Sequence, residues 1–562
     1  MPTDGSLSSA CGGRELGPLQ YDVVVIGGGI NGVGVARDCA LRGLTVALFE
    51  RHDFGFGASG NSTGFIHGGP RYLLTAPQVT RDSCVDSGHI QHIAPHLVFR
   101  VPVLLPIDRR RGKWSLTLHD AFFRAYDRFQ PLKRGKPHVR LEADELVALE
   151  PSLRGDFVGA VTFDEWGIDG VRLCVLNAVD AIERGAVVRT HHTVRKIVRH
   201  TDGRVSGVRV VDTLTGQEGS VAARVVVNAT GAWAPITAAL GGLAPDAAPV
   251  RPGKGIHVYF DRRLSNYAVI VQAVDGRQVF VLPWQNVTVI GTTDDDFYGN
   301  LDDPVATAEE VRYLVQAVAR LMPSITRARA VGTWAGVRPT LFEWGKDEDA
   351  LSRDHRIVDH AEHGAPGLYS MIGGKLSSYR LFAEQMCDVI GERLGRRAPC
   401  RTASLRLPGS DPEVDVAALA ERAGIDRVAA QRLVYRHGGR ALAVVERMAR
   451  SPRGAEAVCG CEPVTEAEIR HVVEHELART VGDVARRTRL GLGPCGGMRC
   501  AARCGAIVAQ MTDRSPLAGQ REAREFLAWT QRRRLPALGP AQARQELLLR
   551  ASWRSELGSE EP

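Results

Sequence analysis

Short apolar runs separated by glycine- and proline-containing segments dominate the first half of the chain. Val23–Ile26 and Val225–Val227 are continuous apolar stretches with the length of a buried strand. No stretch approaches the roughly 18 apolar residues that a membrane-spanning helix needs. Between the strand patterns, segments such as Val171–Arg184 have the pattern of helices. This alternation predicts an α/β fold with a parallel sheet.

A second group of patterns predicts a domain inserted into the first. Strands are expected at Leu97–Ile107, Asp156–Phe163, Tyr267–Leu282 and Val287–Thr292, and a helix at Asp120–Phe129. The parallel-sheet domain is expected to return at Leu368–Leu394, so it is discontinuous in sequence. Val414–Arg450 then has the pattern of amphipathic helices. The predicted class is therefore α/β and α+β, with an inserted mixed-sheet domain and a small helical module at the C-terminus.

A glycine-rich turn joins the first predicted strand to a helix. Gly27, Gly29 and Gly32 form the pattern G-x-G-x-x-G, and Glu50 ends the next strand. The first glycine permits a tight turn, the second lets the backbone approach a pyrophosphate, and the third lets helix and strand pack closely. The helix N-terminus offers free amides, and a carboxylate at position 50 can accept hydrogen bonds from ribose hydroxyls. These features predict a Rossmann-like dinucleotide-binding domain.

Two later segments favour FAD over a nicotinamide dinucleotide. Arg51–Gly69 is rich in glycine and serine, and it can run beside an extended cofactor. Arg224–Trp233 has the pattern of a buried strand that ends in Ala-Thr-Gly and returns beside the flavin. A second G-x-G-x-x-G does not occur in the sequence. The candidate cofactor-binding residues are Gly27, Gly29, Asn31, Gly32, Glu50, Ser59, Gly231 and Gly374.

Composition and charge narrow the class of protein. Apolar residues make up 44% of the 562 and charged residues 24%, which are ordinary values for a globular protein. The net charge of +7 is small for this length and gives no support for nucleic-acid binding. The N-terminus has neither a basic start nor an apolar run, so we expect no secretory signal and a cytoplasmic protein. Its eleven cysteines are accordingly not expected to form a disulfide framework.

Taken in order, these motifs closely resemble those of FAD-dependent glycerol-3-phosphate dehydrogenases, within the D-amino-acid-oxidase-like flavoprotein group. The matching pieces are IGGGINGVGVARDCALRG, IHGGPRYL, VVVNATGAW, KGIHVYF, FVLPW, IGTTD, GVRP, SRD and GGKLSSYR. The resemblance implies oxidation of sn-glycerol 3-phosphate to dihydroxyacetone phosphate, with hydride passing from C2 to FAD. It also implies an FAD-dependent oxidoreductase part over residues 21–398. The residues before it, 1–20, are expected from their own sequence to be disordered.

The resemblance assigns substrate binding to a set of mostly basic residues. Arg71 and Tyr72 end HGGPRY, Arg338 lies in GVRP, and Arg353 lies in LSRD. An arginine fork suits a phosphate because it can donate two parallel hydrogen bonds. Lys375, in GGKLSSYR, is expected to hold the substrate or the negative charge that develops on the reduced flavin.

His257, in KGIHVYF, is the candidate acceptor of the hydroxyl proton. The segment has a strand pattern, and a histidine there could take the proton as hydride leaves for the flavin. The multisubunit anaerobic enzymes of this family usually lack a histidine at this position, so a purely structural histidine is the alternative. Together with Arg338 and Lys375, His257 makes up the predicted catalytic set.

Four cysteines near the C-terminus form two close pairs, Cys459-x-Cys461 and Cys495-x4-Cys500. Such pairs can bind Zn²⁺ or a [2Fe–2S] cluster, and C-x-C is awkward for a single zinc ion. The stretch resembles the bacterioferritin-associated-ferredoxin-like [2Fe–2S] domain that ends the catalytic subunit of anaerobic glycerol-3-phosphate dehydrogenase. A [2Fe–2S] cluster is therefore favoured, with zinc or no metal as alternatives. Cys504, one helical turn after Cys500, is expected to take no part.

The C-terminal part is expected to divide into a helical linker region (399–455), the [2Fe–2S] domain (456–512) and a tail (513–562). Within it, Arg479–Arg489 (RTVGDVARRTR) is either a solvated helix face or a source of positive charge for the cluster. The tail is either a peripheral helix or a docking site for a membrane partner.

The expected electron acceptor is a quinone, or a membrane-anchor or electron-transfer subunit. This implies peripheral association with the inner face of the plasma membrane. His257 and the FVLPW…GTTD segments resemble the single-chain respiratory enzyme, whereas the tail resembles the catalytic chain of the anaerobic enzyme. One alternative is an FAD oxidase that acts on an amine or hydroxy acid with oxygen as acceptor. Another is a non-catalytic electron carrier, but such a protein needs no phosphate pocket made by Arg71, Arg338 and Arg353.

Overall fold

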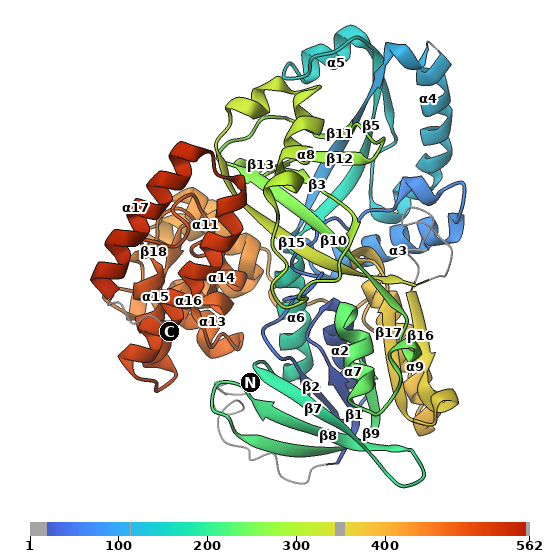
Figure 1. The fold of residues 1–562 in the computed structure, drawn as a ribbon, viewed down its shortest axis with the longest axis vertical. Helices are drawn as coiled ribbons and strands as arrows, with labels where there is room; N and C mark the ends of the chain where they lie inside the picture. Colours follow the sequence, from blue (N-terminus) through green and yellow to red (C-terminus); the bar gives the residue numbers. More distant parts are fainter. Residues whose placement is uncertain (1–19, 113, 343–354, 558–562) are drawn as a thin grey trace.

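The computed structural model of the chain describes residues 20–112, 114–342 and 355–557. The predicted disordered segment 1–20 therefore lies almost wholly outside the described residues. Figure 1 shows one sheet at the bottom, a second sheet at the top and a helical C-terminal module to one side. This arrangement agrees with the predicted fold class, a Rossmann-like domain with an inserted mixed-sheet domain and a helical C-terminal module.

The first sheet has the topology that the glycine motif predicts. Its described strands are β1 (Gln20–Ile26), β2 (Val46–Phe49), β6 (Val187–Arg189), β7 (His192–Arg199), β8 (Val205–Asp212), β9 (Glu218–Asn228), β16 (His355–Asp359) and β17 (Leu368–Gly373). Along the order β16-β17-β9-β1-β2-β6, strand β1 pairs in parallel with β2 on one side and with β9 on the other. The strand order thus reverses at β1, and ligands of open α/β sheets bind beyond the carboxyl end of such a strand.

Both faces of this sheet are covered, which explains the continuous apolar run of β1. Val23 and Val25 belong to a core shared with α2 (Ile30–Leu41), α6 (Gly170–Glu183) and α9 (Tyr379–Leu394). Val24 and Ile26 point to the other face and pack with side chains of β7, β8, β9 and α7 (Ala234–Ala239). A strand that is buried on both faces needs apolar residues at every position.

The second sheet forms the inserted domain. Its described strands are β3 (Val98–Asp108), β4 (Val139–Glu142), β5 (Phe157–Ile168), β10 (Val250–Phe260), β11 (Ala268–Gln272), β12 (Gln278–Trp284), β13 (Val287–Gly291), β14 (Asp295–Asp296) and β15 (Ala330–Leu341). It is mixed, as predicted, because β11 runs parallel to β3 whereas the other pairings are antiparallel. The run Tyr267–Leu282 is two strands rather than one, since Gly276 takes a positive φ in the turn between β11 and β12.

Helices complete the inserted domain. They are α4 (Trp114–Tyr126), α5 (Ala143–Leu149) and α8 (Ala308–Ala319). Helix α3 (Pro77–Ile93) lies between the two domains, because Ile90 and Ile93 belong to the core of the first and Cys84 to that of the second. The helix expected at Asp120–Phe129 is α4, which begins six residues earlier and ends in a 3-10 turn at Asp127–Lys133. Side chains of α8 pack on one face of the second sheet, and aromatic residues of α4 pack on the other.

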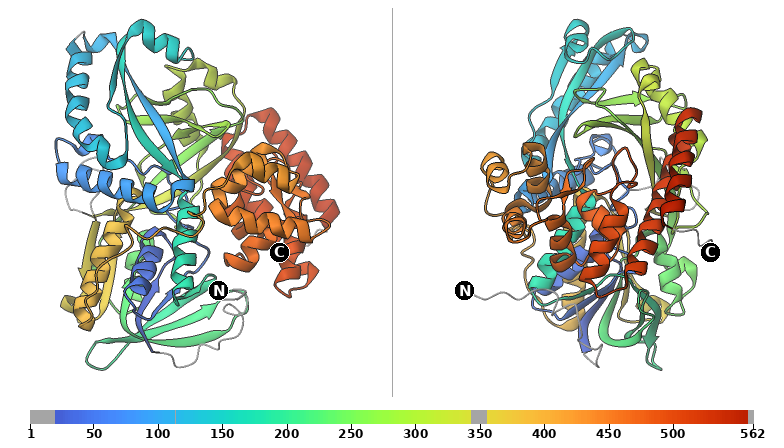
Figure 2. Two further views of the ribbon diagram at one scale, coloured as in Figure 1. Left: turned by 180° about the vertical axis from the view of Figure 1, so that it is seen from behind. Right: turned by 90° about the vertical axis from the view of Figure 1, so that its left-hand side faces the viewer.

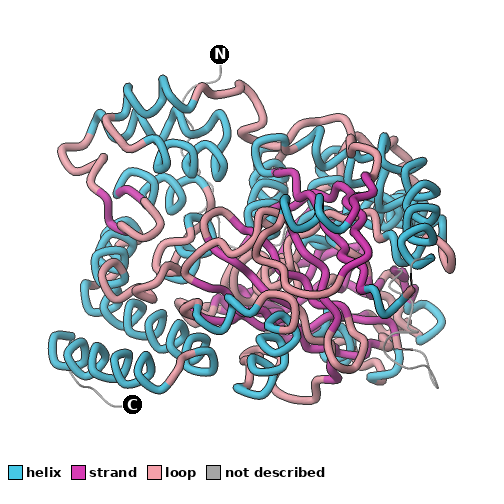
Figure 3. The backbone as a smooth tube through the Cα atoms, turned by 90° about the horizontal axis from the view of Figure 1, so that it is seen from above, coloured by secondary structure: helices cyan, strands magenta, loops and turns pink. Residues whose placement is uncertain are grey.

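The C-terminal module is helical and contacts both preceding parts. Its elements are α10 (Val416–Ala423), α11 (Arg427–His437), α12 (Ala441–Arg450), β18 (Ala457–Cys459), β19 (Val464–Thr465), α13 (Glu466–His475), α14 (Val481–Thr488), α15 (Ala501–Met511), α16 (Pro516–Arg534) and α17 (Pro540–Leu557). Figures 2 and 3 show it as a separate group of helices beside the two sheets. It touches the first domain at α6 and the second at β15. None of the described helices has the length and apolar character needed to cross a membrane.

Candidate active site and cysteine centre

A cavity of about 1290 Å³ lies where the two sheets meet. Its wall includes the turn after β1, the end of β2, residues 56–59, the turn after β9, part of β15 and the turn after β17. Pockets for single small ligands measure roughly 300–1,000 Å³, so this cavity has room for an extended dinucleotide together with a small substrate.

The glycine motif forms the phosphate-binding end of this cavity. Gly27 has a φ of +109°, and a Cβ there would lie 2.8 Å from the carbonyl oxygen of Ala229. A Cβ on Gly32 would lie 2.0 Å from the carbonyl oxygen of Gly27, so only glycine lets helix α2 approach the turn. Gly29 caps α2 without a side-chain hydrogen bond, which leaves N-terminal amides available to an anion. Gly32 supports the turn from behind, whereas Gly27, Gly29 and Asn31 line the cavity.

Glu50 and Ser59 fix the same end of the cavity from the side. Glu50 accepts hydrogen bonds from the backbone amides of Gly28 (2.6 Å) and His52 (2.7 Å). Burial raises the pKa of its carboxyl group, and these two amides oppose that rise. The Ser59 hydroxyl accepts a hydrogen bond from the Ile30 amide (3.0 Å). Glu50 and Ser59 line the cavity, as do the predicted cofactor residues Gly231 and Gly374.

Arg71, Tyr72 and Lys375 lie together in the wall of the cavity. The Lys375 ammonium lies 4.0 Å from the centre of the Tyr72 ring, and the Arg71 guanidinium carbon lies 4.9 Å from it. The ring therefore brings two cations close to one another at the cavity surface. Such a group suits a dianionic ligand.

Arg338 lines the same cavity and is held in place by the IGTTD segment. Its guanidinium donates to the Asp294 carboxylate (2.8 Å), the Thr292 hydroxyl (3.0 Å) and the Thr293 carbonyl (3.2 Å). It also lies over Gly255, where a Cβ would approach within 2.3 Å of an Nη atom. In the sequence, IGTTD served only as a family marker. The motif contains one acidic residue and two threonines. That combination is the sequence signal that could have indicated hydrogen-bond partners for a substrate-binding arginine.

His257 lies behind the cavity wall. It is 2% exposed, stacks on Trp334 at 4.8 Å between ring centres, and shares a hydrogen bond of 2.9 Å with the hydroxyl of Thr63. Thr63 lines the cavity, but His257 does not. Burial, aided by the nearby charge of Arg338, lowers the pKa of His257 to about 3. Its predicted role as proton acceptor therefore depends on a route through Thr63. His67, which was not among the predicted site residues, lines the cavity directly.

Arg353, the remaining predicted substrate residue, lies outside the described residues. The cavity thus brings together Arg71, Tyr72, Arg338 and Lys375, and it places His257 one side chain away.

The four predicted metal-ligand cysteines converge in the C-terminal module. The sulfurs of Cys461 and Cys495 are 3.7 Å apart. A hydrogen bond with Cys500, together with backbone amides that include that of Gly491, lowers the pKa of Cys459 to about 6 although burial opposes this. The pKa values of the other two shifted thiols are raised instead, that of Cys461 mainly by burial and that of Cys500 mainly by its hydrogen bond to Cys459. Amides directed at sulfur, as around Cys459, are a feature of thiolate sites.

The sulfurs are arranged as two pairs rather than as one compact group. Cys461 lies with Cys495, and Cys459 with Cys500. In the described part of the chain, no three of these sulfurs lie within 4.8 Å of one another. A single tetrahedral ion needs all four sulfurs in one shell, whereas a two-iron cluster takes two thiolates on each side. The residues present therefore fit a [2Fe–2S] cluster better than zinc. Cys504 is buried in the same core as Cys459 and Cys500, and its burial raises its pKa.

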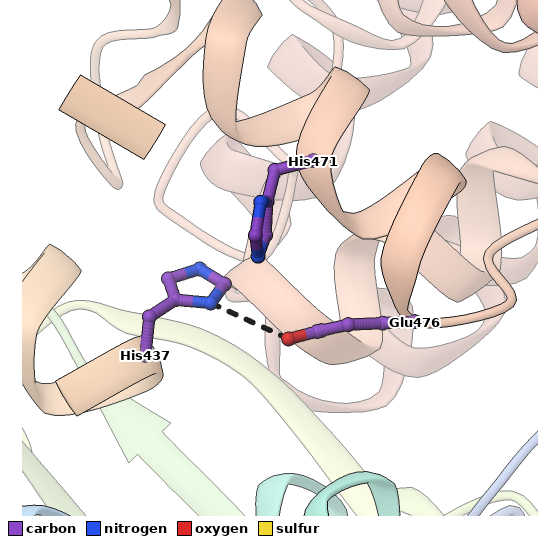
Figure 4. Close-up of side chains that lie close together, drawn as sticks. All are labelled: His437, His471 and Glu476. Atoms are coloured by element: carbon purple, nitrogen blue, oxygen red, sulfur yellow. Dashed lines mark ion pairs between the residues drawn. The ribbon is translucent and has the colours of Figure 1, made fainter. Parts of the chain in front are cut away.

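His437, His471 and Glu476 form a further buried group with ligand atoms close together, drawn in Figure 4. The Glu476 carboxylate already pairs with both terminal nitrogens of Arg172, at 2.5 and 3.0 Å, and His437 lies between it and Glu468. A divalent ion would compete with Arg172 and leave excess positive charge inside the protein. The group is therefore better explained as an ion-pair network that joins the module to α6.

The segment RTVGDVARRTR is not a solvated helix face. The other interpretation, positive charge for the cluster, stays a prediction, and Arg489 pairs with Glu462, next to Cys461, at 3.6 Å. The central residues of the segment form α14, and Arg487 is completely buried rather than solvated. The Arg487 guanidinium donates to both carboxylate oxygens of Asp53, at 2.7 and 2.9 Å, and not to the cysteine loop. A buried arginine needs a partner of opposite charge, and here the partner lies 434 residues away in the chain.

Comparisons with protein families agree with this geometry. Residues 22–380 match the family described as FAD dependent oxidoreductase, and residues 400–516 match the C-terminal domain of alpha-glycerophosphate oxidase. The second match spans all but the first residue of the predicted linker region (399–455) and the whole of the predicted [2Fe–2S] domain (456–512).

Curated relatives cover nearly the whole chain. A subunit of the anaerobic glycerol-3-phosphate dehydrogenase of Escherichia coli is 34% identical over 498 residues, which are 87% of this chain and 88% of that protein. Glycerol-3-phosphate dehydrogenase 1 of Mycobacterium bovis is 34% identical over 522 residues, which are 88% of this chain and 96% of that protein. Among solved structures, the glycerol-3-phosphate dehydrogenase of Bacillus halodurans, complexed with FAD, has the same fold. Its TM-score is 0.69 at 24% identity, with 98% of this chain and 97% of that chain covered.

Proposed function

Because the chain belongs to the FAD-dependent glycerol-3-phosphate dehydrogenase family, we propose that it oxidises sn-glycerol 3-phosphate at C2 to dihydroxyacetone phosphate. When bound, FAD supplies the acceptor for the hydride that leaves C2. The turn after β1, Glu50 and Ser59 are the residues that would hold the dinucleotide.

The observation that carries this proposal is the pairing of Arg71 and Lys375 around Tyr72, in the same cavity as Arg338. These cations would bind the phosphate dianion and orient the glycerol backbone toward the flavin end of the cavity. An amine or hydroxy-acid substrate has one carboxylate and would use fewer of them.

The proton of the substrate hydroxyl needs an acceptor in the same cavity. We propose that the Thr63 hydroxyl receives this proton while it passes its own proton to the Nε2 atom of His257, to which it is hydrogen-bonded. The 2.9 Å contact between the Thr63 hydroxyl and Nε2 supports this relay, whereas burial, which lowers the pKa of His257 to about 3, opposes protonation of the ring.

For the electron acceptor, we infer that Cys459, Cys461, Cys495 and Cys500 hold a [2Fe–2S] cluster. When bound, such a cluster carries electrons singly to a quinone or to a partner protein. The two sulfur pairs and the amides around them support this assignment. We further propose that the protein works at the cytoplasmic face of the membrane as a peripheral protein, because a quinone resides in the bilayer.

An anaerobic titration of the purified protein with glycerol 3-phosphate tests the substrate assignment. We expect glycerol 3-phosphate to bleach the flavin absorbance at about 450 nm. Glycerol, which lacks the phosphate, should leave this absorbance unchanged. If FAD is bound but only an amine or a hydroxy acid bleaches it, the protein is an oxidase of the wider group and the proposed substrate is wrong.

A further inference from the structure

Helix α14 of the C-terminal module packs against the back of the loop that lines the dinucleotide end of the cavity. We call residues 51–59 the FAD loop; Arg51, His52, Phe56, Gly57, Ala58 and Ser59 line the cavity. Asp53, between them, is fully buried and points away from the cavity toward α14.

Asp53 and Arg487 join the loop to the helix. Both side chains are almost completely inaccessible, at 1% and 0% exposure, and the contact is bidentate. Arg487 also donates from Nε to the Glu476 carbonyl oxygen (2.8 Å) and from Nη1 to the Asp483 carbonyl oxygen (2.9 Å). The arginine is therefore fixed by its own module before it reaches the loop.

Two further contacts reinforce this attachment. The Arg486 guanidinium lies 5.2 Å from the centre of the Phe56 ring. Asp483 pairs with His191 (2.8 Å), whose amide donates to the carbonyl oxygen of His52 (2.8 Å). Three residues of α14 thus act on three residues in or beside the FAD loop.

The FAD loop in turn fixes the phosphate-binding turn. The Gly55 amide donates to the carbonyl oxygen of Gly28 (3.1 Å), and the His52 amide donates to Glu50, which also accepts from the Gly28 amide. A displacement of Asp53 would therefore reach both the pyrophosphate end and the ribose end of the cofactor site.

We propose that Arg487 is a positioning residue for FAD: by fixing Asp53 it holds the FAD loop in the shape that receives the cofactor, so the C-terminal module determines how tightly FAD is retained. This rests on the assignment of the cavity to FAD but not on the identity of the substrate. Because α14 leads directly into the loop of Cys495, the same helix couples the cysteine centre to the flavin site.

The test measures FAD affinity by titrating apoprotein and following flavin fluorescence, with thermal unfolding recorded in parallel. For Arg487→Met we expect the Kd of FAD to rise at least about tenfold, a typical size for coupling between two sites. The matched control is Arg436→Met, which breaks the similarly buried and bidentate Arg436–Glu468 pair inside the C-terminal module and shares no partner with Arg487. The control should lower the unfolding temperature similarly but keep the Kd within about twofold.

The double variant Asp53→Asn/Arg487→Met separates an effect on the position of the FAD loop from an effect on the stability of the fold. If Arg487→Met does not fold, Arg487→Lys replaces it. Removing both charges should restore much of the thermal stability without restoring FAD affinity, and the lysine should give an intermediate Kd. An unchanged Kd in Arg487→Met, an equal rise in Arg436→Met, or a Kd that recovers together with stability would each overturn the proposal. A parent protein that binds FAD but is not reduced by glycerol 3-phosphate contradicts the proposed substrate alone.

Discussion

The ammonium of Lys375 lies 4.0 Å from the centre of the Tyr72 ring. The two residues are far apart in the sequence: Tyr72 ends one short 3-10 turn, and Lys375 directly precedes another. Their contact means that an aromatic ring helps to set the position of a substrate cation. A ring attracts an ammonium group without neutralising it, so the positive charge still acts on an incoming phosphate.

Removing the Tyr72 ring should therefore weaken substrate binding. We expect Tyr72→Leu to raise the KM for glycerol 3-phosphate by about five- to tenfold, the equivalent of one cation–π contact of roughly 1 kcal/mol or slightly more. Tyr72→Phe keeps the ring and should change the KM little. Steady-state kinetics with both variants provides the check, and an equally large effect of Tyr72→Phe would show that the hydroxyl acts instead.

Arg338 should contribute directly to substrate binding, and Asp294 should contribute through it. Because hydrogen bonds to a charged group are worth about 1.5–3 kcal/mol, Arg338→Ala should lower kcat/KM by about 10- to 150-fold. Asp294→Asn weakens the 2.8 Å ion pair and should mainly raise the KM. Arg251→Ala breaks another Arg–Asp pair of the same sheet outside the cavity and serves as the control. If kcat/KM fell equally in Arg338→Ala and Arg251→Ala, both residues would contribute to the stability of the fold rather than to substrate binding.

The rate of flavin reduction should reveal the route of the hydroxyl proton. If the proton passes through Thr63 to His257, the variants Thr63→Val and His257→Asn should slow reduction by a similar factor, about 10²-fold or more for a lost acid–base group. His67→Asn is the comparison, because His67 lines the cavity itself. A large loss in His67→Asn with normal rates in the other two would move the proton acceptor to His67.

The buried neutral state of His257 should make the folded protein sensitive to acid. Its folded-state pKa of about 3 lies below the ordinary value of 6.5, so below pH 6.5 the unfolded chain binds a proton that the folded one does not. This group should therefore cost up to about 1.4 kcal/mol of stability per pH unit as the pH falls from 6.5 toward 3. Urea unfolding of the parent and His257→Asn at several pH values measures the difference, and parallel pH profiles would contradict it.

The cysteine centre should lose its metal when one sulfur of a pair is removed. We expect Cys461→Ser to lose iron and the paramagnetic signal of the reduced protein, because Cys461 lies 3.7 Å from Cys495. Cys504→Ser, which alters a buried cysteine of the same module, should keep both. Metal analysis distinguishes the alternatives: zinc in place of iron would support a zinc site, and no metal in the parent would exclude a cluster.

The sequence alone predicts those parts of the site whose chemistry depends on residues close together in the chain. Gly27 and Gly32 were predictable because their spacing alone fixes the turn and the packing of α2. The strand that contains His257 was predictable too, but not which of its faces meets the cavity. Trp334, which covers the His257 ring, comes from the neighbouring strand.

Contacts between distant segments were not predictable from one sequence. Asp53 and Arg487 both look like ordinary charged residues of polar segments, and only the packing of α14 on the FAD loop buries them. The division of Tyr267–Leu282 into two strands was not predictable either, because the turn at Gly276 lies inside an otherwise strand-like pattern.

The discontinuity of the first domain has a consequence for the order of events during synthesis. Strand β17 completes the sheet by pairing with β9 from Leu368 onward, after the whole inserted domain has been made. Strand β8 already pairs with the first part of β9, but until the ribosome has passed Gly373 the edge at Val226–Asn228 has no partner. Unpaired edges are sites of aggregation in nascent chains. The Asp53–Arg487 pair forms later still. We therefore expect the flavin site to mature only when nearly the entire chain has emerged, so premature termination leaves products that cannot hold the cofactor.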